Sequence, residues 1–232
     1  MENSLARLTP GRIAIFSAAA LPVGALVTTL GVYLTNFYAA HVGIPLAAVG
    51  LAFMAVRLVD ISLDPFLGVF MDHTRTRLGK FRPWLALSAP ILIVSTIAIY
   101  FPAQGVGTFY LIGWLLVLYA GYSMLTLSQS GWGAALVDEY HQRSRVYGWI
   151  QAVAVVGAIG VLLVPSLLPA FWKAIPYKGV PLMGAFVIAT VVIGVGLTVF
   201  FAPEPEKARE AERFGMRDYL PLIKRPEMIR LI

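Results

Sequence analysis

Three charged residues lie close together in an otherwise apolar stretch of the sequence, and their spacing suggests cation chemistry. On a helix, Arg57, Asp60 and Asp64 fall within about a 60° arc of one face. In a bilayer, three uncompensated charges cost roughly 8–10 kcal/mol, so they are retained where they face partners, water or a bound ion. One arginine neutralises only one carboxylate. The second acid therefore predicts a cation site or proton carrier at Asp60 and Asp64, with Arg57 as ion-pair partner; the alternative is an Arg–Asp pair that only fixes helix packing.

The neighbouring residues favour a proton over sodium as the coupling ion. Sodium needs several hard oxygen ligands beside the carboxylates. A proton needs only a carboxylate whose neutral form is favoured by burial or by a like-charged neighbour. Leu63 cannot be a ligand, and Ser62 points about 200° away from Asp64 on a helix. We therefore expect a proton rather than sodium, and no organic cofactor.

The composition indicates what surrounds these charges. The chain has 232 residues, of which 59% are hydrophobic and 13% are charged, and it contains no cysteine; its mean hydropathy is +0.78. A soluble domain has roughly 25% charged residues and could not keep so many apolar ones from water. The absence of cysteine excludes a disulfide scaffold and a thiolate metal site, and the three histidines lack metal-ligand spacing, so no metal site is expected. The sequence predicts an all-α integral membrane protein.

Six apolar stretches are long enough for helices that cross the bilayer, which takes about 20 residues for roughly 30 Å of hydrocarbon. Each stretch is continuous rather than alternating, which favours helices over the strands of a membrane barrel. The first stretch is too long for a secretory signal and lacks a convincing cleavage site. The expected spans cover approximately residues 13–40, 46–71, 84–101, 109–137, 146–168 and 181–201.

Lysine and arginine are unequally distributed between alternate connections. The connections on one side hold eight of them and those on the other side hold two, which places both termini in the cytoplasm. Residues 202–232 add seven more and are expected to form a cytoplasmic linker toward a seventh helix, with the second half of the protein absent. The basic segments are 1–12, 72–83 and 138–145, and the alternate connections are 40–45, 102–108 and 169–180.

The connection after the second span carries a motif that is more specific than a basic loop requires. Residues 64–84 read DPFLGVFMDHTRTRLGKFRPW. A role in binding nucleic acid is not expected, because the segment joins two membrane spans. The motif closely resembles that of the glycoside–pentoside–hexuronide:cation symporters, the melibiose-permease-like branch of the major facilitator superfamily. A second match is Trp132, late in the fourth span, followed by the arginine-rich connection at Arg143 and Arg145.

The resemblance implies the N-terminal six-helix half of a twelve-helix symporter that works by alternating access, with a C-terminal half as its partner in a bacterial inner membrane. In that family, acids on the second helix bind the coupling cation, and Asp60 and Asp64 match those positions. The resemblance also implies a cytoplasmic latch that forms ion pairs across the inner face of the closed state. The expected latch residues are Asp72, Arg75, Arg77, Lys80 and Arg82.

The sequence departs from melibiose-type members where they bind sugar and sodium. The first span has no acid, Ser128 stands at the position of an aspartate on the fourth helix, and Leu63 stands at the position of an asparagine in sodium-using members. The resemblance therefore implies a sugar or related small solute rather than a particular galactoside. Candidate solute-binding residues are Ser128, Gln129, Trp132, Gln151 and Asn36.

Other classes of function fit parts of the same pattern. A six-helix membrane scaffold or partner protein would show the same spans, and a major-facilitator transporter of a non-sugar solute would share the charged stripe. An intramembrane enzyme would need a second cluster of catalytic or metal-binding side chains in the spans. The sequence shows no such cluster, serine triad, P-loop or dinucleotide fingerprint, so we expect a transporter and not an enzyme.

Overall fold

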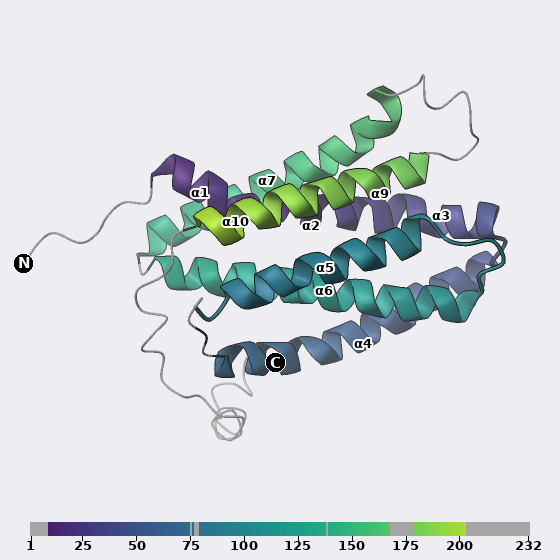
Figure 1. Ribbon diagram of the computed structural model, residues 1–232, viewed down its shortest axis with the longest axis horizontal. Coiled ribbons are helices and arrows are strands. Elements are labelled where there is room, and N and C mark those ends of the chain that lie inside the picture. The colour runs from purple at the N-terminus through teal and green to yellow at the C-terminus, as the bar shows by residue number, and fades with distance from the viewer. Residues whose placement is uncertain (1–8, 75, 77–78, 138, 168–178, 203–232) are drawn as a thin grey trace, which may run out of the picture.

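The computed structural model describes residues 9–74, 76, 79–137, 139–167 and 179–202. Within these ranges the chain is helical, and six segments are long and apolar enough to cross a membrane (Figure 1). The expected all-α, six-span architecture is therefore confirmed. The six segments are Ala20–Val42, Leu46–His73, Arg82–Tyr100, Thr108–Leu136, Tyr140–Pro165 and Gly179–Phe201.

Four of these spans are single helices, and the first and last contain π-helical turns, written η below. The single helices are α4 (Leu46–His73), α5 (Arg82–Tyr100), α6 (Thr108–Leu136) and α7 (Tyr140–Leu167). The first span runs through α2 (Ala20–Thr29), η1 (Leu30–Leu34), α3 (Thr35–Phe37) and η2 (Tyr38–Val42), and a short helix α1 (Pro10–Ser17) precedes it. The last span runs through α9 (Gly179–Thr190), η3 (Val191–Val195) and α10 (Gly196–Phe201).

The packing order of the helices determines where space is left for a site. α5 packs along α6, which also contacts α4, whereas α2 packs along α7, and α9 contacts α2, α5 and α7. In Figure 1, α4 lies along the lower edge of the bundle and α7 along the upper edge. α4 meets the first span through α3 and η2, next to the short connection between them. This arrangement leaves a pocket between the first span, α4 and α6.

Buried polar side chains connect the first span to α5. The Tyr38 hydroxyl donates a hydrogen bond to the carbonyl oxygen of Ile99 at 3.0 Å, and the hydroxyls of Thr29 and Tyr100 bond to each other. Tyr38 and Tyr100 are fully buried. By contrast, α4 and α7 carry many exposed apolar side chains, as expected of helices that face lipid or another membrane-embedded surface.

The first span, predicted over residues 13–40, is not one continuous helix, because the chain is broken between α1 and α2. Pro22 explains the break. It has no N–H to offer to the carbonyl of Ala18, and its ring crowds that carbonyl. The N–H of Leu21 bonds to the Ala18 oxygen instead, at 3.1 Å. Proline is tolerated within membrane helices, so the apolar pattern alone did not reveal the break.

The predicted connection over residues 138–145 is also mostly wrong, because α7 already begins at Tyr140. Polar residues with ordinary helix propensity can continue a helix beyond the apolar stretch, so the helix need not begin where hydrophobicity does. Residues 169–178, which make up most of the predicted connection 169–180, and residues 203–232 of the predicted linker lie outside the described residues.

Candidate cation and solute site

Asp60 lies on the face of α4 that packs against α6, and both of its carboxylate oxygens are engaged. Its side chain is almost entirely buried. Arg57 Nη1 donates to Oδ2 at 3.0 Å within the same helix, and Ser123 Oγ of α6 donates to Oδ1 at 2.8 Å. A buried carboxylate needs such partners, because an unpaired one would be strongly destabilising. Arg57 and Asp60 therefore form the ion pair that their spacing suggested.

Asp64 lies one turn further along α4 in different surroundings. Its side chain is half-buried, and its Oδ1 atom is buried without a hydrogen-bond partner among the described residues. The nearby Ser62 hydroxyl does not donate to this oxygen, because Ser62 Oγ donates to the carbonyl of Leu58 at 3.1 Å. A buried carboxylate oxygen without a donor can take up a proton or a cation. Of the two predicted cation-binding acids, Asp64 is thus the one with an oxygen available.

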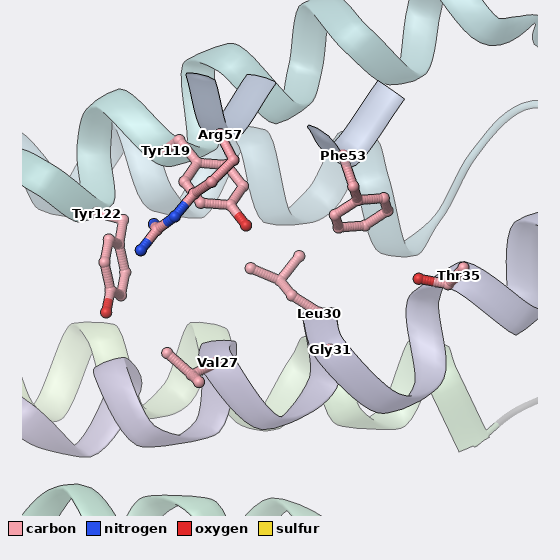
Figure 2. A pocket seen from close by; sticks show the side chains of 8 residues that line it. All are labelled: Val27, Leu30, Gly31, Thr35, Phe53, Arg57, Tyr119 and Tyr122. Carbon is pink, nitrogen blue, oxygen red and sulfur yellow. The ribbon is translucent and has the colours of Figure 1, made fainter. Parts of the chain in front are cut away.

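A pocket of about 410 Å³ borders the ion pair. Figure 2 shows the Arg57 guanidinium extending from α4 into it, beside the ring of Tyr119. The guanidinium carbon lies 5.7 Å from the centre of that ring, within the range of a cation–π contact. Arg57 therefore belongs both to the ion pair and to the pocket wall. The lining residues are Val27, Leu30, Gly31, Thr35, Phe53, Arg57, Tyr119 and Tyr122.

Most of the residues that line this pocket were not selected from the sequence. A helical signal was present, since Phe53 precedes Arg57 by four residues, and Tyr119 and Tyr122 are three apart. Each pair therefore shares a helix face. Choosing that face required knowing that α4 and α6 pack together and leave this corner open beside the first span.

Three of the predicted solute-binding residues are buried in α6, away from the pocket. Ser128 lies with its hydroxyl 3.8 Å from Met71 Sδ, and Gln129 Nε2 donates to the carbonyl of Phe16 at 3.3 Å. Trp132 is almost fully buried and packs edge-on against Phe16, with ring centres 5.7 Å apart. Here these side chains contact α1 and α4 and do not line the pocket between the first span, α4 and α6.

The other two predicted solute-binding residues, Gln151 on α7 and Asn36 on α3, are exposed on separate helices. None of the five lines the pocket. The structure thus does not bring the predicted solute residues together, because sequence periodicity does not reveal which helix each polar side chain meets. Their roles in binding solute stay predictions.

The described residues of the predicted latch interact within this bundle. Lys80 Nζ lies 2.8 Å from Asp72 Oδ1. Arg82 Nη2 donates to the carbonyl of Ala202, after α10, at 2.8 Å, and the Arg82 guanidinium lies 5.5 Å from the ring centre of Trp132. These contacts join the start of α5 to α6 and α10, whereas ion pairs across the inner face stay a prediction. Outside the described residues lie Arg75 and Arg77.

Comparison with known proteins settles the family. Residues 15–229 match the family model described as MFS/sugar transport protein. The chain belongs to this family. The resemblance to glycoside–pentoside–hexuronide:cation symporters, suggested by residues 64–84, is thereby confirmed, and the six apolar helices make the chain a multi-pass integral membrane protein.

Curated relatives of this MFS sugar-transport chain include transporters from several bacteria. The isoprimeverose transporter of Lactiplantibacillus pentosus is 29% identical over 174 residues, which cover 73% of this chain and 36% of that protein. The inner membrane symporter YicJ of Escherichia coli K12 is 27% identical over 212 residues, covering 86% of this chain and 44% of that protein. A lactose permease of Lactobacillus helveticus is 31% identical over 135 residues, covering 55% of this chain and 19% of that protein. The chain therefore spans less than half the length of these relatives.

Proposed function

We propose that the chain forms the N-terminal six-helix half of a secondary active symporter that moves a sugar or related small solute together with a cation. One observation carries the proposal. Asp64 keeps a buried oxygen to which none of the described residues donates, one turn from an Arg57–Asp60 ion pair that borders a pocket of about 410 Å³. Arg57 pairs with Asp60 beside the candidate cation site and also lines the pocket. Through Arg57, cation binding and solute binding can influence each other, as symport requires. The chain has no catalytic role in this proposal.

Charge balance favours one monovalent cation, and the oxygen supply favours a proton. Arg57, Asp60 and Asp64 together carry one net negative charge in the span, so a proton on Asp64 makes the group neutral and lowers the cost of enclosing it. The two carboxylate oxygens of Asp60 already accept hydrogen bonds from Arg57 and Ser123. Sodium would need several oxygen ligands, whereas a proton needs only Asp64.

The pocket suits a small polar solute with ring faces. Its volume lies within the roughly 300–1,000 Å³ of typical ligand pockets. Tyr119, Tyr122 and Phe53 offer aromatic surface, while Thr35 and Arg57 offer groups that can hydrogen-bond to hydroxyls. Relatives named for isoprimeverose and lactose transport support a sugar as the solute class.

The working protein in this proposal lies in a bacterial inner membrane with both chain ends in the cytoplasm. The excess of lysine and arginine in alternate connections supports this orientation. A second six-helix half completes the carrier, because alternating access moves one half against the other around a site near the membrane midplane. The exposed apolar faces of α4 and α7 are surfaces that lipid or that half could cover.

Solute uptake under imposed ion gradients tests the proposal. The full-length protein, containing this chain and its second half, is reconstituted into vesicles and offered radiolabelled mono- and disaccharides under a proton gradient or a sodium gradient. We expect at least one sugar to accumulate above its external concentration with the proton gradient, and an uncoupler to abolish the accumulation. A protein that moves none of these sugars under either gradient would contradict the proposal and would favour a scaffold or a transporter of a non-sugar solute.

A further inference from the structure

The break between α1 and α2 is held by polar side chains from two other spans. The N–H of Ala19 donates to Thr198 Oγ1 at 3.2 Å. The same Thr198 hydroxyl lies 2.9 Å from the carbonyl oxygen of Gly194 in its own span, 3.1 Å from that of Ile15 and 3.2 Å from that of Phe16. Gln129 Nε2 donates to the Phe16 carbonyl at 3.3 Å. Inside a membrane, backbone groups freed from a helix must find partners, and Thr198 and Gln129 supply them here.

The last span approaches the same break very closely. A Cβ atom at Gly194 would lie 2.4 Å from the carbonyl oxygen of Ala18. Gly194 belongs to the π-helical turn η3, and such turns occur frequently at functional sites. Figure 1 shows α1 beside α10 at one end of the bundle, and the two helices are in contact. The break is therefore tightly enclosed without being part of a continuous helix.

Ser17, the last residue of α1, adds a second observation. It is fully buried, and its hydroxyl has no hydrogen-bond partner among the described residues. A buried hydroxyl without a partner costs free energy that hydration would recover. Displacement of α1 would let water reach the Ser17 hydroxyl. Hydration of this hydroxyl therefore favours a second arrangement in which α1 has moved.

We propose that the break between α1 and α2 is a hinge, and that α1 is a gate held shut by Thr198 and Gln129. Opening exchanges the hydrogen bonds of these side chains to the backbone of α1 for water and separates Phe16 from Trp132. Pro22 has already removed one helical hydrogen bond here, so the backbone bonds to be strained at the hinge are those from Ala18 to Ile15, at 3.2 Å, and from Leu21 to Ala18, at 3.1 Å. The gate lies at the end of the bundle that the charge distribution assigns to the cytoplasm. Its role in gating rests on the proposed symport, but the hinge itself does not.

Thiol labelling of a single introduced cysteine tests the hinge without a solute. The sequence contains no cysteine, so Ser17→Cys adds one buried thiol to this chain. The full-length protein in lipid nanodiscs, with any cysteine of its second half replaced, is treated with a membrane-impermeant maleimide, and the labelling rate is measured. Thr198→Val should raise the rate about tenfold, the factor that one buried hydrogen bond of ordinary strength is worth. Pro22→Ala, which restores the missing N–H, should lower it.

Two controls separate a hinge from general loosening. Thr190→Val changes a buried threonine of the same span that bonds within its own helix, and it should leave the rate unchanged. Ser95→Cys places the thiol in the buried face of α5, where Thr198→Val should have no effect. Gln129→Leu replaces Thr198→Val if the latter does not fold.

The pattern of rates decides the outcome. An unchanged rate at Ser17→Cys in the Thr198→Val or Gln129→Leu protein would overturn the hinge, and so would equal increases at Ser17→Cys and Ser95→Cys. If the expected pattern is found but the unmodified protein accumulates no solute, the hinge stands and the proposed symport is wrong.

Discussion

Asp60 and Asp64 are chemically identical and one helical turn apart, but their surroundings make them unequal. Asp60 is paired by Arg57 and Ser123, whereas Asp64 keeps a buried oxygen without a donor among the described residues. We therefore expect loss of Asp60 to affect mainly the packing of α4 on α6, and loss of Asp64 to affect mainly coupling. The spacing of the two acids predicted a shared site, but only the packing of α6 distinguished them.

The hydrogen bond from Ser123 to Asp60 should contribute measurably to stability. Ser123→Ala leaves a buried carboxylate oxygen without its donor, which typically costs about 1–3 kcal/mol. We expect a lower midpoint of thermal unfolding in detergent, where unfolding is monitored by intrinsic fluorescence. Ser130→Ala changes an exposed serine of the same helix and should leave the midpoint unchanged. Equal midpoints for the two variants would show that the bond does not stabilise the α4–α6 contact.

The Arg57–Asp60 pair should behave as a coupled unit. Arg57→Gln leaves Asp60 buried without its counter-charge, so it should destabilise more in the parent protein than in an Asp60→Asn background. We expect a coupling free energy of about 1 kcal/mol from the double-mutant cycle, because Arg57 itself is more than half exposed. The unfolding free energies of the four proteins give this value. Additive effects would indicate an ion pair that contributes nothing to stability.

At the scale of helices, α2 and α7 are held together by close backbone contact. A Cβ atom at Gly157 of α7 would lie 2.1 Å from the carbonyl oxygen of Leu21. Gly157→Val should push the helices apart and destabilise the protein by about 1–3 kcal/mol or more. Gly148→Val, on the same helix with open space at its Cβ position, serves as the matched control and should have little effect. Thermal unfolding compares the two, and equal midpoints would contradict the close packing.

The sequence predicted the six spans well and their contacts poorly, for a physical reason. Hydrophobic length determines whether a segment can cross a bilayer, so all six spans were found from the apolar stretches. Contacts depend on which helix faces which. Trp132 was predicted to meet solute but packs against Phe16, and Tyr119 was not selected but lines the pocket. The break before α2 was missed because Pro22 is compatible with an apolar membrane span.

For the whole molecule, the exposed helices α4 and α7 are the surfaces where we expect lipid or the proposed second half to pack. They lie along opposite edges in Figure 1 and carry many exposed apolar side chains. The chain spans 36% of the isoprimeverose transporter and 44% of the YicJ symporter that it resembles. Coupled transport is accordingly a property to test in a full-length carrier, whereas the proposed cation-binding acids, Asp60 and Asp64, both lie in this chain.

The accumulation ratio of a transported sugar in vesicles with an imposed proton gradient tests the central claim most directly. The full-length protein is compared with Asp64→Asn and with Glu139→Gln, a change at an exposed acid just before α7. We predict that Asp64→Asn loses uphill accumulation, with inside and outside concentrations becoming equal, while downhill equilibration persists and Glu139→Gln accumulates sugar like the parent protein. Undiminished uphill accumulation by Asp64→Asn would contradict the assignment of the coupling ion to Asp64.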